Sequence, residues 1–76
     1  MNIKHIGANQ TELSINSVGT ILFSYDTPVA AKTPEGTFKT SKKFSNTTSK
    51  HISSWTSYDG EKDQAYFEEL LKWNKQ

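Results

Sequence analysis

The first two-thirds of the chain alternates between apolar and polar positions with a period of two residues. Leu13 and Ile15 share one face of a stretch whose other positions are polar, and Ile21, Phe23 and Tyr25 share one face of the next. Such alternation is typical of β-strands with one buried and one exposed face. The strands predicted in this way cover approximately residues 12–16, 20–25, 29–32 and 37–40.

Glycine and proline residues mark where these strands end. Pro28 has no amide hydrogen to donate to a neighbouring strand, so we expect it to interrupt the sheet. Pro34 and Gly36 occupy the second and last positions of a sequence that fits a type I turn. Ile3 and Ile6 indicate a further short strand at the edge of the sheet.

The last third of the chain has the three-to-four-residue spacing of helices. A short helix is predicted at approximately 48–56, where the hydroxyl of Thr47 or Thr48 can cap the first turn. The last helix, approximately 61–74, has acidic residues at its start and lysines at its end, as the helix dipole favours. Its apolar stripe consists of Tyr66, Phe67, Leu70, Leu71 and Trp73.

These elements predict one α+β domain over residues 1–76, because so short a chain rarely divides into two cores. We expect a small antiparallel sheet of three to four strands, within roughly residues 2–45, with the two C-terminal helices packed on one face. The predicted core is Leu13, Ile15, Ile21, Phe23, Val29, Phe38, Ile52, Trp55, Phe67, Leu70 and Trp73.

Charge is divided between two segments although the whole chain carries a net charge of only +1. Residues 32–51 have a net charge of +4, whereas residues 59–69 have a net charge of −4. All nine basic residues are lysines, so the chain lacks the planar guanidinium that binds carboxylate or phosphate groups through two hydrogen bonds. This separation predicts binding to a charged partner.

The chain contains few of the residues that carry catalysis or bind metals. It has no cysteine, and its two histidines, His5 and His51, do not have the spacing of a metal site. No serine lies in a nucleophile-elbow sequence and no glycine-rich phosphate loop occurs. We therefore expect a protein that is not an enzyme, with no catalytic residue, metal or cofactor. No apolar run resembles a signal peptide or membrane span, so we expect a cytoplasmic location and no membrane partner.

The segment 39–51 is rich in lysine and hydroxyl side chains and permits two interpretations. It can form a basic surface that binds a protein or the phosphates of a nucleic acid. Alternatively, its lysines protect a sheet edge, Phe44 lies in the core and a threonine caps a helix. The acidic last helix can similarly mimic nucleic acid or simply satisfy the helix dipole. The candidate contact residues are Tyr25, Lys42, Lys43, Phe44, Lys50 and His51.

Two segments, 23–31 and 40–52, resemble a small domain found in bacteriophage and mobile-element genomes. The shared pattern is Tyr-x-Thr-Pro-Val-Ala, then a lysine-rich hairpin, then Ser-x-Thr-Thr-Ser-Lys-His-Ile, and it covers roughly residues 19–56. The resemblance implies a phage protein acting in the host cytoplasm. Our leading hypothesis is an anti-defence (anti-CRISPR-like) factor that blocks a host nuclease, polymerase or CRISPR effector by steric occupation. The alternative is a nucleic-acid-binding accessory protein, and the oligomeric state stays open.

Overall fold

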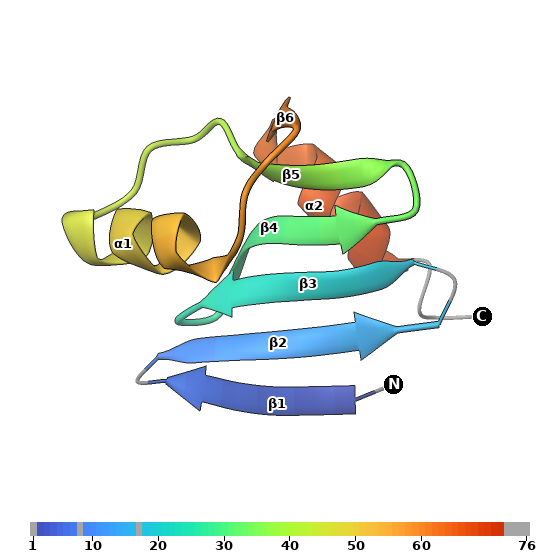
Figure 1. The fold of residues 1–76 in the computed structure, drawn as a ribbon, viewed down its shortest axis with the longest axis horizontal. Coiled ribbons are helices and arrows are strands. Elements are labelled where there is room, and N and C mark those ends of the chain that lie inside the picture. The colour runs from blue at the N-terminus through green and yellow to red at the C-terminus, as the bar shows by residue number, and fades with distance from the viewer. Residues whose placement is uncertain (1, 8, 17, 73–76) are drawn as a thin grey trace.

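A single six-stranded sheet organises the protein. The computed structural model describes residues 2–7, 9–16 and 18–72 (Figure 1). The strands are β1 (Asn2–Gly7), β2 (Gln10–Ile15), β3 (Gly19–Ser24), β4 (Thr27–Thr33), β5 (Gly36–Thr40) and β6 (Gly60–Lys62). The helices are α1 (Asn46–Trp55) and α2 (Gln64–Lys72). The strands lie in sequence order from β1 to β6, so each one pairs with its neighbour in the chain.

The sheet is larger than predicted, and it is mixed. The prediction of three to four antiparallel strands was wrong, because β1 to β5 are antiparallel and β6 adds to β5 in parallel. Parallel neighbours need a crossover connection, and α1 lies in the segment that connects β5 to β6. Residues 60–62, which the sequence placed at the start of the last helix, form β6 instead. That helix therefore begins at Gln64.

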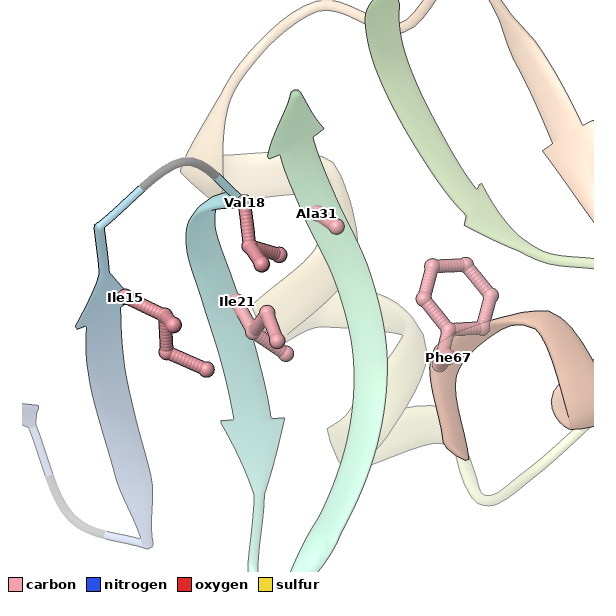
Figure 2. Close-up of a cluster of buried hydrophobic side chains, with 5 residues drawn as sticks. All are labelled: Ile15, Val18, Ile21, Ala31 and Phe67. Carbon is pink, nitrogen blue, oxygen red and sulfur yellow. The ribbon is translucent and has the colours of Figure 1, made fainter. Parts of the chain in front are cut away.

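The two helices pack on opposite faces of the sheet, which corrects the prediction that both cover one face. Phe67 of α2 is fully buried beside Ile21 of β3 and Ala31 of β4, as Figure 2 shows. This face is called the α2 side below. Its buried cluster is Ile15, Val18, Ile21, Ala31 and Phe67, with Leu13, Phe23, Phe38, Tyr66, Leu70 and Leu71 packed around it.

The other face, called the α1 side below, has a separate core. Leu22 of β3 is fully buried there, although the alternation of the sequence placed it among the exposed positions. A strand covered on both faces loses its two-residue hydrophobic period, which explains the omission of Leu22 from the predicted core. The cluster contains Leu22, Val29 and Ala30, with Ile6, Phe44, Ile52, Trp55 and Tyr58 against it.

Pro28 lies inside β4 rather than interrupting the sheet. Leu22 pairs with Ala30 and Phe23 pairs with Pro28, so Val29 is an extra residue in β4. Such a bulge accommodates a proline within a strand because the local ladder of hydrogen bonds is already broken. The carbonyl of Pro28 accepts a hydrogen bond of 2.6 Å from the side-chain amide of Gln64, which ties α2 to this strand.

The helix ends also differ from the prediction. Ser45, rather than Thr47 or Thr48, caps α1, and its Oγ accepts a hydrogen bond of 3.3 Å from the amide of Thr48. Trp73, which was assigned to the core and to the last helix, lies outside the described residues, as does position 74. Neither α1 nor α2 has the length and apolarity that a membrane-spanning helix requires.

Candidate binding surface

Tyr25 is held at the tip of the β3–β4 hairpin. Ser24 pairs with Thr27, so Tyr25 and Asp26 form a two-residue turn. The backbone of Tyr25 has a φ of 58°, while φ is not positive at Asp26. A positive φ at the first turn position alone is the pattern of a type II′ turn, where glycine is normal. This backbone conformation is sterically unfavourable for a bulky residue such as tyrosine. The side chain of Tyr25 is half exposed.

A chain of hydrogen-bonding side chains fixes α1 against the end of β3. The Oγ of Ser24 lies 3.0 Å from Oγ1 of Thr48 and 2.9 Å from Nδ1 of His51. The hydroxyl of Ser45 donates to Oγ1 of Thr48 at 3.4 Å. Ser24 and Thr48 are both buried, so these bonds satisfy polar groups that water cannot reach. The same bonds position the ring of His51.

His51 and Tyr25, which lie 26 positions apart in the sequence, meet at this end of the sheet. Their ring centroids are 6.3 Å apart and the ring planes are inclined by 42°. His51 is partly exposed, and Lys50 beside it is exposed on the outer side of α1. The structure therefore brings together an aromatic hydroxyl, an imidazole and a helix that carries an ammonium group.

The other three predicted contact residues lie in the segment that leads from β5 to α1. Lys42 places its Nζ 5.3 Å from the ring centre of Phe44. Phe44 is partly buried against the α1-side cluster, so its ring serves mainly as core. Lys43 is exposed between them. The structure thus gives Phe44 a packing role and leaves Lys42 and Lys43 at the surface.

The two charged segments of the sequence lie mainly on different faces of the sheet, so the two faces differ in net charge. On the α1 side, Lys32 lies 4.7 Å from the ring of Trp55, and Lys39 lies 5.7 Å from the ring of Tyr58. Two acids on this side have partners of their own: Glu12 accepts from the indole of Trp55 at 2.6 Å, and Glu61 pairs with Lys39 at 3.9 Å. The lysines of the α1 side are Lys4, Lys32, Lys39, Lys42 and Lys50.

The α2 side carries more acid. Glu68 and Glu69 are exposed on α2, and Asp63 precedes it and accepts from the amide of Tyr66 at 3.0 Å. The lysines on this side are Lys72, which is paired with Glu69 at 3.2 Å, and Lys62, which lies 4.8 Å from the ring of Phe38. The α1 side is therefore the basic face of the protein, and the Tyr25–His51 pair lies at its end.

A model of the family of unknown function DUF8033 matches residues 1–70. The chain belongs to the DUF8033 family. No curated protein and no solved structure matches it. The DUF8033 match encloses all the residues of the shorter resemblance found from the sequence, and it extends along α2 as far as Leu70.

In this DUF8033 protein, three hydroxyl residues support the surface from below: Ser24, Ser45 and Thr48. Ser24 and Ser45 were not predicted from the sequence, and Thr48 was predicted only as a candidate helix cap. A signal for them was present, because all three lie in or beside the recurring pattern of the resemblance. That pattern contains the residues that join α1 to β3. Ser24 is only 2% exposed, so a substrate cannot reach its hydroxyl while α1 is in place. Within residues 2–7, 9–16 and 18–72, no three potential metal ligands converge.

Proposed function

We propose that this is a phage-encoded binding protein that inhibits or modulates a host protein by occupying part of its surface. Defence proteins of the host, such as a nuclease or CRISPR effector, are typical targets of short phage accessory proteins, although the resemblance itself carries no known activity. The binding surface comprises Tyr25, His51, Lys50, Lys42 and Lys43 and is called the Tyr25 surface below.

The observation that carries this proposal is the backbone of Tyr25. A bulky residue with positive φ costs of the order of 1–3 kcal/mol, and such strain is concentrated at functional sites. Tyrosine is also among the residue types that contribute most to binding energy at interfaces, because it is large, rigid and polar at its tip. The fold is therefore less stable than it could be, because it holds an exposed tyrosine in a strained conformation at the end of the basic face.

Rigid positioning of the anchor supports the same function. The amide of Tyr25 donates a hydrogen bond of 2.7 Å to the carbonyl of Asn9, and His51 packs near the ring. An anchor fixed before binding loses less conformational entropy when the complex forms. The exposed lysines of the basic face can accelerate encounter with an acidic partner.

The basic α1 side favours a second candidate, a nucleic-acid-binding accessory protein. Lysine ammonium groups and the hydroxyls of α1 can contact phosphates without reading the base sequence. However, Lys32 and Lys39 already lie over the rings of Trp55 and Tyr58, and Phe44 is packed against the core, so these three rings do not present a free face on which bases could stack. The Tyr25 anchor therefore favours a protein partner.

The decisive experiment compares two exposed large side chains. Immobilised wild-type protein, Tyr25→Ser and Ile3→Ser are each exposed to extracts of candidate bacterial hosts. Ile3 is 66% exposed and Tyr25 is 50% exposed, so both substitutions remove an accessible apolar group. We expect wild type and Ile3→Ser to retain one specific host protein that Tyr25→Ser loses. Equal retention by all three would refute the Tyr25 surface.

Charge reversal separates the two candidates. Lys50→Glu changes the basic face, whereas Lys72→Glu changes net charge equally on α2. For a nucleic-acid binder, affinity for DNA or RNA falls steeply with salt and falls further with Lys50→Glu than with Lys72→Glu. For a protein binder, neither DNA nor RNA is retained at low salt. Lys50→Glu then weakens capture of the host protein, whereas Lys72→Glu does not.

A further inference from the structure

The direction of the hydroxyl chain beneath the Tyr25 surface is set from its Ser45 end, because the distances alone allow either group to donate at the two contacts of Ser24. Each hydroxyl carries a single proton. The Ser45 hydroxyl donates to Thr48, so the proton of Thr48 is free to go to Oγ of Ser24, 3.0 Å away. The proton of Ser24 then goes to Nδ1 of His51, 2.9 Å away. This direction keeps the bond that Ser45 donates to Thr48, whereas the reverse direction requires Thr48 to donate to Ser45.

The direction determines which atom of His51 carries the proton. If Nδ1 accepts from Ser24, the neutral imidazole holds its hydrogen on Nε2. Nε2 is therefore a hydrogen-bond donor.

Nε2 is available to a partner. Within the described part of the chain it has no hydrogen-bond partner, and no buried side-chain nitrogen or oxygen there lacks one. The atom therefore reaches solvent. The titratable and charged groups near the ring are the phenol of Tyr25, Asp26 in the same turn, and Lys50 next to it on α1. None of the ion pairs in the described residues includes His51.

We infer that Nε2 of His51 donates a hydrogen bond to a carboxylate of an acidic segment on the partner protein. The inference rests on the function proposed above and names the chemistry that the Tyr25 surface recognises. The phenol of Tyr25 and the ammonium of Lys50 provide further donors, so an anionic acceptor fits better than a neutral carbonyl.

The first test needs no partner. Heteronuclear NMR of the imidazole nitrogens in the free, full-length protein is expected to show the neutral form of His51 with its proton on Nε2. In Ser24→Ala this preference is expected to decrease toward a mixture of both tautomers. A proton on Nδ1 of His51 in the wild-type protein would overturn the inference, and this result does not depend on the folding of any variant.

The second test uses two anionic probes of known chemistry, a short poly-glutamate peptide and single-stranded oligothymidylate. We expect the peptide to shift the Nε2–H signal of His51. His5 is the internal control, because its Nδ1 also contacts a hydroxyl, that of Thr11 at 3.1 Å, but it lies in β1. A response only to oligothymidylate, or none at His51, overturns the inference.

The two proposals can fail separately. If His51 has the Nδ1 proton but host capture still depends on Tyr25, the function stands and this inference is lost. If poly-glutamate shifts His51 as expected but Tyr25→Ser captures the host protein as well as wild type does, the Tyr25 anchor is lost and the donor role of His51 is retained.

Discussion

The amide of Tyr25 donates a hydrogen bond of 2.7 Å to the carbonyl oxygen of Asn9, and both residues have positive φ, 58° and 61°. Asn9 lies in the β1–β2 turn and Tyr25 in the β3–β4 turn, so the bond joins two hairpin tips. Asparagine tolerates this conformation well, but tyrosine does not. The strain is therefore concentrated at Tyr25.

Replacement of Tyr25 by glycine is expected to stabilise the fold. Glycine adopts positive φ without steric cost, so the free energy of unfolding should rise by about 1 kcal/mol despite the loss of a half-exposed ring. Urea denaturation measures the change. Tyr25→Val is the control, because a β-branched residue keeps the strain and should not stabilise. If Tyr25→Gly is less stable than wild type, the tyrosine is not strained in solution.

The hairpin strands and both helices could be located from the sequence because their hydrophobic periods are local. The arrangement of the helices could not, because one-face burial was inferred from alternation in both β2 and β3, and the burial of Leu22 in β3 does not follow that alternation. Ile21 and Leu22 are adjacent and both fully buried, which is possible only where both faces are covered. The three residues of β6 carry no period at all and are strand only because they pair with Phe38, Lys39 and Thr40.

For the candidate site, the sequence indicated side chains but not their support. Tyr25, Lys50 and His51 were selected for their chemistry, whereas Phe44 proved to be partly buried in the α1-side cluster. The left-handed backbone of Tyr25 has no signal in the sequence, since the expected residue there is glycine. Ser24 was overlooked because its contacts with Thr48 and His51 depend on the position of α1 over β3.

Gly19 allows β3 to approach β4 closely, and alanine should not be tolerated there. Its φ is 123°, and a Cβ would lie 1.9 Å from the carbonyl oxygen of Lys32. Gly19→Ala is expected to lower the free energy of unfolding by about 3 kcal/mol or more. Gly60→Ala is the matched control, because its Cβ would meet Phe38 at an ordinary 3.7 Å. Equal effects in thermal unfolding would contradict the close approach.

Thr48 should contribute far more to stability than its neighbour Thr47. Thr48 is 4% exposed and bonds to both Ser24 and Ser45, whereas Thr47 is exposed on the outer side of α1. Thr48→Ala leaves the buried hydroxyl of Ser24 with one partner fewer, at an expected cost of about 1–3 kcal/mol. Thr47→Ala should change stability by less than about 0.5 kcal/mol. Chemical denaturation of both variants checks this, and a larger loss in Thr47→Ala would refute the network.

Tyr58 should resist ionisation in the folded protein. Burial raises the pKa of Tyr58 from its ordinary value of 10.0 to about 12, and its hydroxyl donates a hydrogen bond of 2.6 Å to the carbonyl of Ile52. Because the folded state favours the neutral phenol, this contribution to stability is complete below pH 10 and is lost as pH rises from 10 toward about 12.

The prediction for Tyr58 is tested by following tyrosinate absorbance during an alkaline titration of wild type and Tyr58→Phe. The difference between the two curves isolates Tyr58, and its midpoint is expected near pH 12. Stability is also compared at about pH 9 and about pH 11, which bracket the ordinary pKa of tyrosine. The free energy of unfolding should fall more between these two pH values in wild type than in Tyr58→Phe, since phenylalanine cannot ionise. A difference curve centred near pH 10 would mean that the ring of Tyr58 is open to water.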